Sequence, residues 1–393
     1  MIKTLSFCII ATSSIASIAQ SQHTVEGLIL SRSDSAAIPF ASIYINQHTG
    51  TIANEDGYFK LTSDKPITQI AISHVNYEPL SLPADHLTGF QKIYLFEKSF
   101  QLAEVTVSGN TAETEIKLAI KKSSQAVVLP VSLKGYYSEF VKTNGQYEKF
   151  ADGIIQYYIP QNYKDEKSID AKVLASRAID LQPNGEIDLD LASPVGVRFA
   201  LRNYNVSRLK KFLDSLSFDD YKFGIVSGDD DDNAVIHFSP KPNRKKILYE
   251  GLMHISKENN LIKFLDYKIA EETVPFAREV GILVIKVRQI SGHGVFIFDH
   301  HPDSHHYLPV YIREEFGLKI FNNKIDQSNV FIQQFQLLEA NPVDKSPIRK
   351  SEEYSKKALY KNGTKYTERF WESANLIQAT KEEEEIVKKT STN

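Results

Sequence analysis

The chain has 393 residues, a formal net charge of −3 and a single cysteine. This length is enough for two or three domains, each with a core of its own. The near balance of charges excludes binding to nucleic acid through neutralisation of phosphates, because that needs an excess of basic residues. The 19 tyrosines and 22 phenylalanines stand beside many Ile and Val residues, and this composition favours β-structure.

Residues 1–19 have the pattern of a secretory signal peptide. Lys3 provides the positive start, an apolar run of small and aliphatic residues follows, and Ser17-Ile18-Ala19 has small residues at both positions that determine cleavage. We expect cleavage after Ala19. The mature chain is then exported, and it resides in the periplasm, at the outer membrane or outside the cell.

The mature chain is expected to lack both cysteine and a membrane-spanning segment. Cys8 lies inside the apolar run of the signal peptide and would be removed with it. A thiol nucleophile, a disulfide framework and a cysteine-based zinc site are therefore not expected. No later run approaches the roughly 18 apolar residues of a helical membrane span.

Short alternating runs separated by turn signals extend from Thr24 to Glu97. Strands this short, with turns this regular, are typical of a β-sandwich. The runs are HTVEGLIL, FASIYIN, GYFKLTS, ITQIAIS and KIYLFEK.

This region resembles the carboxypeptidase regulatory-like domain, which is also called the transthyretin-like domain. The resemblance covers roughly residues 24–108, and we place the domain at residues 20–108. It implies a seven-stranded β-sandwich without catalytic residues of its own. The residues that carry it are Gly27, Ile38-Pro39, Ala41, Ile43, Gly50, Asn54-Glu55-Asp56-Gly57, Phe59, Leu61, Ile72 to Tyr77, and the LAEVTV segment at 102–107.

The acidic segment Asn54-Glu55-Asp56-Gly57 can be interpreted as a cation site or as a corner between two strands. Asn and Asp stabilise turns through bonds from the side chain to the backbone, and Gly57 can supply a positive φ. A Ca²⁺ site needs roughly six oxygen ligands, and this segment offers about three. The turn is therefore the preferred interpretation.

Residues 109–130 change to a helical period. Ile116, Ala119 and Ile120 recur at helical spacing, and the order of acidic residues before basic ones suits the helix dipole. We predict a linker helix that joins two β-domains.

Residues 131–340 return to strands and predict a larger antiparallel meander or half-barrel. Four hairpins are expected: residues 133–159 around Asn144-Gly145, residues 221–240, residues 246–270, and residues 294–316. Asn-Gly is the strongest short hairpin signal. This region resembles the middle of uncharacterised exported proteins, and in topology alone it is similar to half-barrel lipoprotein carriers, a likeness that does not fix function.

Other segments predict a few short helices and a charged end. Arg208 to Ser217 has the pattern of a short helix, and residues 178–199 read as an insertion rich in loops. Residues 341–393 form a helical or charged C-terminal segment, in which Phe370 and Trp371 are expected to dock the last ordered part. The run KEEEEIVKK is interpreted as a frayed helix or tail.

The strongest candidate for a metal site is the histidine-rich stretch from His293 to His306. Imidazole and carboxylate ligands suit Zn²⁺, and a hairpin that turns at Pro302 to Ser304 can bring histidines together across strands. The competing interpretation, which we prefer, is an exposed polar turn with no metal. The candidate ligands are His300, His301, His305 and His306, with His293, Asp299 and Asp303 nearby.

Signatures of catalysis are lacking in the sequence. It has no HExxH helix, no G-x-S-x-G elbow, no P-loop and no G-x-G-x-x-G cradle. The alternation of strands and long helices that an α/β catalytic core needs is missing as well. We therefore predict a protein that is not an enzyme and has neither a catalytic residue nor a cofactor.

The expected function is binding or scaffolding in the cell envelope, with the sandwich as the interaction module for an envelope protein. Exposed sheet edges can recruit a partner by strand addition. Two alternatives stay open: a periplasmic carrier of lipid or another hydrophobic ligand, and a metal-dependent hydrolase built on the His293–His306 cluster. Paired tyrosines at Tyr136, Tyr137, Tyr157 and Tyr158 leave a lipid or glycan groove open, although cross-strand packing is the preferred interpretation.

Overall fold

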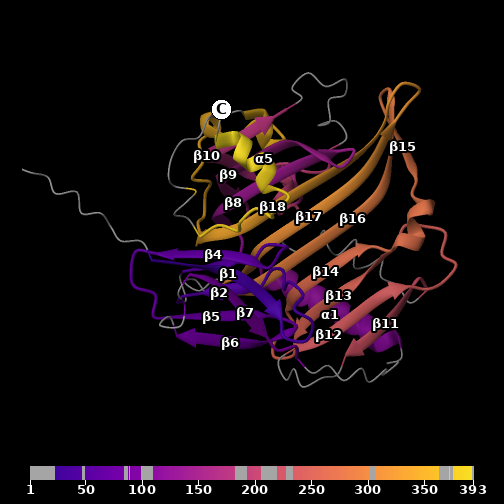
Figure 1. The fold of residues 1–393 in the computed structure, drawn as a ribbon. Coiled ribbons are helices and arrows are strands. Elements are labelled where there is room, and N and C mark those ends of the chain that lie inside the picture. Colours follow the sequence, from indigo (N-terminus) through magenta and orange to yellow (C-terminus); the bar gives the residue numbers. More distant parts are fainter. Residues whose placement is uncertain are drawn as a thin grey trace, which may run out of the picture.

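The computed structural model describes residues 23–46, 49–83, 87, 89–98, 109–181, 193–204, 219–226, 233–300, 306–362, 371 and 375–391. These residues are mainly β-structure: two small sheets near the N-terminus, then helix α1 (Gly109–Ala126), then one large sheet (Figure 1). The mainly β fold predicted from the sequence is confirmed.

The two small sheets form the predicted seven-stranded sandwich. Its core consists of alternate residues of the strands, such as Ile29, Phe59 and Ile72. One sheet has the order β4-β1-β7 and the other β3-β2-β5-β6. The strands are β1 (His23–Ser31), β2 (Ser42–Tyr44), β3 (Gly50–Ile52), β4 (Tyr58–Ser63), β5 (Gln69–His74), β6 (Tyr77–Pro83) and β7 (Phe90–Leu95).

The large sheet has eleven strands, of which ten follow the order β10-β9-β8-β18-β17-β16-β14-β13-β12-β11, with β15 beside β16. All four predicted hairpins are present, but β18 lies next to β8, so the sheet is not a simple meander. The strands are β8 (Val131–Thr143), β9 (Gln146–Ile159), β10 (Asp170–Asp180), β11 (Tyr221–Val226), β12 (Asn233–Pro240), β13 (Tyr249–Ser256), β14 (Ile262–Ile269), β15 (Glu279–Ile282), β16 (Ile285–His300), β17 (Tyr307–Phe321) and β18 (Asp326–Pro342).

The turn between β8 and β9 follows the sequence prediction. Asn144 has φ 50° and Gly145 has φ 82°. Positive φ at both central residues is the geometry of the hairpin turn that Asn-Gly favours. Asn144 also bonds to Ser328 of the neighbouring strand through both its N–H and its side chain.

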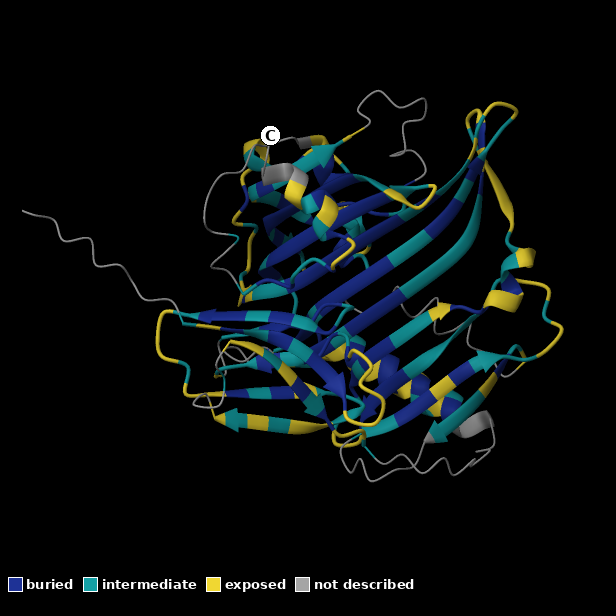
Figure 2. Ribbon diagram, viewed as in Figure 1, coloured by how far each residue is buried: buried dark blue, intermediate teal, exposed yellow. Residues whose placement is uncertain are grey.

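The large sheet is covered on both faces. On one side, the helix face, Ala112, Ile116, Ala119 and Ile120 of α1 pack into the main core of the sheet. On the other side, the sandwich face, the sandwich and the C-terminal residues lie against the strands (Figure 1). Figure 2 shows the central strands as mostly buried, whereas β6 at the outer edge of the sandwich is largely exposed. Helix α1 is therefore part of the second domain's core as well as a link between domains.

Two predicted segments differ from the structure. Residues 178–180 were expected to begin a loop, but they complete β10 and pair with residues 149–151 of β9. The C-terminal run was expected to be a frayed helix or tail. A helix is present, α5 (Glu384–Ser391), but it is packed and not frayed: Glu383 is 1% exposed, and Ile386 packs against Phe140 and Phe150. In both cases partners distant in sequence decided the conformation. The predicted helix at 208–217 lies outside the described residues.

Short 3-10 turns connect the strands. One follows β9, one follows β10, one precedes β15 and two follow β18. The turns are η2 (Glu166–Ser168), η3 (Phe199–Leu201), η4 (Glu271–Phe276), η5 (Lys350–Glu352) and η6 (Leu359–Asn362).

Candidate functional site

The sandwich and the large sheet share a continuous apolar contact. Phe40 and Ile52 of the sandwich belong to one buried cluster with Tyr311 of β17 and Phe264 of β14. The rings of Phe40 and Tyr311 have centroids 5.4 Å apart. Burying aromatic side chains in this way stabilises the contact through removal of apolar surface from water.

The acidic turn Asn54 to Gly57 lies at this contact. The Asn54 side chain accepts hydrogen bonds from the N–H groups of Asp56 (3.0 Å) and Tyr58 (2.9 Å), and Gly57 has φ 72°. These bonds close the corner between β3 and β4 as predicted for a turn. The Asn54 amide in addition donates to the Ala379 carbonyl at 2.9 Å.

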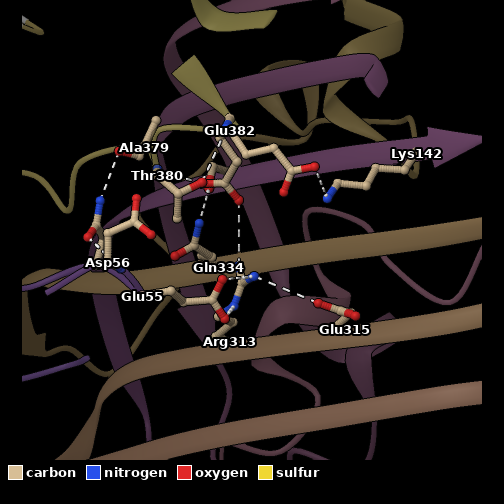
Figure 3. Close-up of polar contacts among 12 residues, drawn as sticks. Glu55, Asp56, Lys142, Arg313, Glu315, Gln334, Ala379, Thr380 and Glu382 are labelled. Atoms are coloured by element: carbon tan, nitrogen blue, oxygen red, sulfur yellow. Dashed lines mark hydrogen bonds and ion pairs between the residues drawn. The ribbon is translucent and has the colours of Figure 1, made fainter. Parts of the chain in front are cut away.

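Glu55 in the same turn binds a guanidinium of the large sheet (Figure 3). Arg313 of β17 donates to both carboxylate oxygens of Glu55, at 2.8 and 2.7 Å. The Arg313 side chain is 4% exposed, and Glu383 and Glu315 each lie 3.8 Å from it. Burial alone would lower the pKa of Arg313, but Glu55 and Glu383 outweigh it, and the net pKa is raised. The acidic turn therefore binds the guanidinium of Arg313 from the same chain.

Residues 375–383, which we call the C-terminal strap, lie across the contact between the sandwich and the large sheet. The Asn375 amide bonds to the N–H (2.7 Å) and the carbonyl (3.0 Å) of Thr62, so it occupies the edge of β4 as a neighbouring strand would. Gln336 of β18 bonds to the Asn375 carbonyl and to the N–H of Ile377. The N–H of Lys381 donates to Asp56 at 2.8 Å. The strap therefore joins the two domains directly.

A cavity of about 270 Å³ lies beside the strap on the sandwich face. Arg177 of β10 binds both oxygens of the buried Asp152 at 2.8 Å, and the guanidinium lies 5.0 Å from the Trp371 ring. Burial raises the pKa of Asp152, while Arg177 opposes that rise. Tyr136 donates to the same carboxylate at 3.0 Å. Aromatic and charged groups thus line this cavity together.

Buried polar groups also gather on the helix face. The Glu314 carboxylate accepts hydrogen bonds from Arg202 (2.8 Å), Gln333 (2.7 Å) and Asn203 (3.3 Å). Glu139 accepts bonds from the Tyr137 hydroxyl and from a backbone N–H. Each of these carboxylates is paired within the fold, as burial of a charge requires. These contacts hold the segment around η3 against the sheet.

The four paired tyrosines divide between the two faces. Tyr137 and Tyr157 are fully buried in the core of the helix face, and Tyr136 packs on the sandwich face beside Trp371. Tyr158 is half-buried, and its hydroxyl reaches the Asp344 carbonyl at 3.3 Å. Alternation along a strand separates neighbours in this way, so the four do not line one groove.

Of the histidine-rich candidate site, the structure describes His293, Asp299, His300 and His306, whereas His301, Asp303 and His305 lie outside the described residues. His300 is the last residue of β16, and its ring centroid is 6.0 Å from that of Tyr307. His306, which precedes Tyr307 in sequence, is half-buried. His293 bonds to Asp266 of β14 at 2.9 Å. Within the described ranges no three His, Cys, Asp or Glu side chains are placed to share a metal ion. The acidic run 229–232 is likewise outside them.

His74 lies at the contact between the two domains. Its ring packs edge-on to Phe264 at 6.2 Å, and its Nδ1 accepts the N–H of Asn76 at 3.2 Å, which requires the neutral imidazole. Burial, together with the nearby charge of Lys98, lowers the pKa of His74 to about 4, although Asp266 opposes both.

We expect His74 to reduce stability as the pH falls from about 6.5 to about 4. In that window the unfolded chain binds a proton that the folded chain does not, so roughly 2 kcal/mol of unfolding free energy should be lost. Urea unfolding at several pH values should show a smaller loss for His74→Gln than for the wild type, whereas His300→Gln, on an exposed side chain, should follow the wild type. Parallel pH profiles for His74→Gln and the wild type would contradict this expectation.

Among the described residues, no helix has both the length and the apolar character to span a membrane.

Comparison with known proteins identifies the N-terminal region. Residues 25–107 match the model of the CarboxypepD_reg-like domain. None of the curated proteins matches the chain. A LolA superfamily protein from Nitrosomonas europaea is 11% identical, with 59% of this chain and 94% of that one covered and a TM-score of 0.22. MucB in complex with MucA(peri) is 9% identical, with coverage of 59% and 98% and a TM-score of 0.17. At TM-scores this low, neither likeness decides the fold or the function of this chain. The sandwich agrees with the sequence match, and residues 25–107 are a CarboxypepD_reg-like domain.

Proposed function

We propose that this chain is a non-enzymatic binding or scaffolding protein of the cell envelope, exported by its signal peptide, with the CarboxypepD_reg-like domain as its interaction module. The observation that carries the proposal is strand β7. It pairs with β1 on one side, and no other described strand pairs with it. A free edge of this kind can accept a strand from a partner protein.

The other edges of the sandwich are less open to a partner. The Asn375 amide already bonds to the backbone of β4, and Thr51 of β3 reaches the strap. Strand β6 contains Pro79 and Pro83, which have no N–H to donate, and its Glu78 N–H is bonded to the Phe96 carbonyl. Proline on an edge strand hinders pairing with another chain. The edge of β7 is therefore the one that strand addition would use.

The backbone groups of β7 that point away from β1 can be assigned. The carbonyl of Leu95 accepts the N–H of Arg32, so the peptide groups of Leu95 face β1. N–H and carbonyl of one residue point to the same side, and the side alternates along a strand. Lys92 and Tyr94 therefore direct their backbone groups outward. The exposed Phe90 (54%) offers apolar surface at the start of this edge.

Buried acidic groups outside the sandwich support a structural rather than a catalytic role. The carboxylates of Asp152, Glu139 and Glu314 each accept two or more hydrogen bonds from the fold itself. Carboxylates that are engaged in this way orient strands and segments. The hydrolase alternative would need the histidine-rich stretch instead.

The carrier alternative remains a separate prediction. Helix α1, the segment around η3 and the residues near η6 pack into the core of the helix face. Apolar side chains of the chain itself thus occupy the position that a hydrophobic ligand would need there. The cavity beside Arg177 is the place where a small polar or glycan ligand would fit best.

We expect Lys92→Pro to weaken capture of a protein partner and Lys92→Ala to preserve it. The proline removes one outward N–H and blocks close approach, which should weaken binding by about tenfold or more, since one unmatched hydrogen-bonding group costs roughly 1–3 kcal/mol. The alanine variant loses the same side chain but keeps the N–H. The tagged mature chain would be purified natively from envelopes, and proteins and lipids that accompany it would be identified by mass spectrometry.

Equal recovery of a stoichiometric partner with the proline variant would refute the β7 edge as the binding site. Bound lipid without any protein partner would favour the carrier alternative. Thermal unfolding of both variants shows whether the sandwich is intact, and we expect it to be, because an edge strand tolerates proline where the N–H faces solvent.

A further inference from the structure

A hairpin tip projects from the end of the large sheet. We define the hairpin tip as residues 278–288, which join β15 to β16, together with the neighbouring turn 319–326 between β17 and β18. Strand β14 pairs with β16 only at residues 293–297, so residues 285–292 continue past it with β15 and β17 as neighbours. At about 3.4 Å per residue, this extension reaches roughly 25 Å beyond β14.

The end of this hairpin exposes large apolar side chains. Leu283 is 84% exposed and Val284 is 83% exposed, and they are the most exposed large hydrophobic side chains of the described residues. Val280 of β15 is 56% exposed, and Phe276, which precedes the hairpin tip in η4, is 41% exposed. Single exposed apolar residues are ordinary, but three on one hairpin favour contact with an apolar partner.

The residues at the turn are unfavourable for a hairpin surrounded by water. Ile282 pairs with Ile285, so Leu283 and Val284 are the two central residues. Leu283 has φ 53°, a conformation that Gly and Asn adopt readily and leucine does not. The β8–β9 turn of the same chain uses Asn144-Gly145 at the equivalent positions. An apolar pair in this place carries backbone strain and exposure together, and contact with an apolar medium would offset both.

The charges around the hairpin tip are predominantly basic, although the whole chain has a net charge of −3. Five basic residues accompany two acidic ones, and Lys286 and Lys319 pair with the acidic ones. No carboxylate of the described residues forms an ion pair with Arg278, Arg288 or Lys324. Such a local excess of positive charge attracts anionic lipid headgroups. The charged residues are Arg278, Glu279, Lys286, Arg288, Lys319, Lys324 and Asp326.

We propose that the hairpin tip docks on an anionic lipid surface, with Leu283 and Val284 inserted among the acyl chains and the basic residues at the headgroups. Apolar side chains surrounded by cations are the combination by which peripheral proteins bind membranes. The basic residues without an ion pair, Arg278, Arg288 and Lys324, favour an anionic lipid surface over the apolar pocket of a protein partner. The sandwich lies at the opposite end of the molecule (Figure 1), so docking would leave the β7 edge accessible. This inference does not rest on the proposed strand addition.

Sedimentation with vesicles tests the proposal on the full mature chain. We expect binding to vesicles of phosphatidylglycerol and phosphatidylethanolamine, and much weaker binding to phosphatidylcholine alone. Leu283→Asn/Val284→Gly removes both apolar side chains and puts Asn, which tolerates a positive φ, at position 283, so it should fold normally and lose at least tenfold in vesicle affinity. Arg278→Gln/Lys324→Gln should weaken binding to the anionic vesicles and reduce its dependence on salt.

Leu174→Asn is the matched control, because Leu174 is 46% exposed but lies on β10, away from the hairpin tip. This variant should bind vesicles as the wild type does. Failure of the wild type to bind anionic vesicles, or unchanged binding by Leu283→Asn/Val284→Gly, would overturn the proposal. If the tip variant loses a purified envelope protein partner while neither chain binds vesicles, the tip is a protein-binding surface and the lipid proposal fails.

Discussion

Arg313→Met is expected to lower the free energy of unfolding by roughly 3–5 kcal/mol, because the substitution leaves the buried Glu383 and the half-buried Glu55 without their partner. Arg313 is 3% exposed as a residue, and Glu383 beside it is 1% exposed. Burial already raises the pKa of Glu383 although Arg313 lowers it in part. Without the guanidinium, the buried Glu383 would either stay charged at a high cost or take up a proton, and Glu55 would lose the partner of both its oxygens.

The same substitution should also loosen the sandwich from the large sheet. Glu55 binds Arg313 at two oxygens, while Asp56 accepts the N–H of Lys381 from the strap. We therefore expect faster hydrogen exchange at the amides of Asp56, Tyr58 and Lys381 in Arg313→Met. Chemical denaturation gives the unfolding free energy, and hydrogen exchange with mass spectrometry reports the loosening.

Arg177→Met is the matched control for that experiment. Arg177 forms an ion pair of the same two-oxygen geometry with the buried Asp152, but it joins β10 to β9 within the large sheet. It should lose stability without faster exchange at the turn that contains Glu55. A second check is Glu55→Gln in the Arg313→Met background, which should recover part of the lost stability because one unpaired charge is removed. A loss below about 1 kcal/mol for Arg313→Met, with unchanged exchange, would show that the apolar contact alone holds the domains together.

The strands and turns could be predicted from the sequence, because they depend on residues that are close together along the chain. Alternation of apolar residues predicts strands, Asn144-Gly145 predicts a hairpin turn, and the resemblance carried by the motif residues implies the seven strands of the sandwich. Their geometry is decided within a few residues along the chain. The match of residues 25–107 to the CarboxypepD_reg-like domain confirms the resemblance drawn from those motifs.

The contact between the domains could not be predicted from such rules. Glu55 and Arg313 are 258 residues apart, and Asn54 and Ala379 are 325 apart. In the YIREEF segment, Arg313 lies between Ile312 and Glu314 and reads as a solvent-facing position of a strand. This face of the strand is buried only because the sandwich and the strap pack against it. Gln334 and Gln336 on the same face of the sheet were the available signal that this face is covered. Buried backbone and side-chain groups need hydrogen-bonding partners, which amide side chains provide.

The charged C-terminal run illustrates the same limit. A run such as KEEEE is usually solvated, and composition alone gives no reason to bury its second glutamate. In the structure the Glu383 carboxylate accepts the N–H of Thr380 at 2.9 Å and lies 3.8 Å from Arg313. Ile386, three residues on, packs against Phe140 and Phe150. A tertiary partner thus decided which acidic residue became interior.

The second large effect is expected from the strap, where Ile377→Ala should lower the free energy of unfolding by roughly 2–5 kcal/mol. Ile377 is 4% exposed and packs with Leu376 among residues of the large sheet and the sandwich. Removing its side chain leaves a cavity between three segments that are far apart in sequence. The loss should appear in urea unfolding followed by circular dichroism.

Trp371, the chain's single tryptophan, lines the cavity beside the strap and gives a local signal for the same variant. If the strap holds the two domains together, the fluorescence of Trp371 in Ile377→Ala should change at lower urea than the circular dichroism of the sheets. The amide of Thr62, which donates to the Asn375 side chain, should also exchange its hydrogen faster in this variant. Gln378→Ala is the neighbouring control, since its half-buried side chain bonds only to the Leu376 carbonyl among the described contacts, and it should change stability by less than about 1 kcal/mol. Equal effects of Ile377→Ala and Gln378→Ala would mean that the sandwich and the large sheet hold together without the strap. The expected difference would instead show that the strap fixes the sandwich to the sheet.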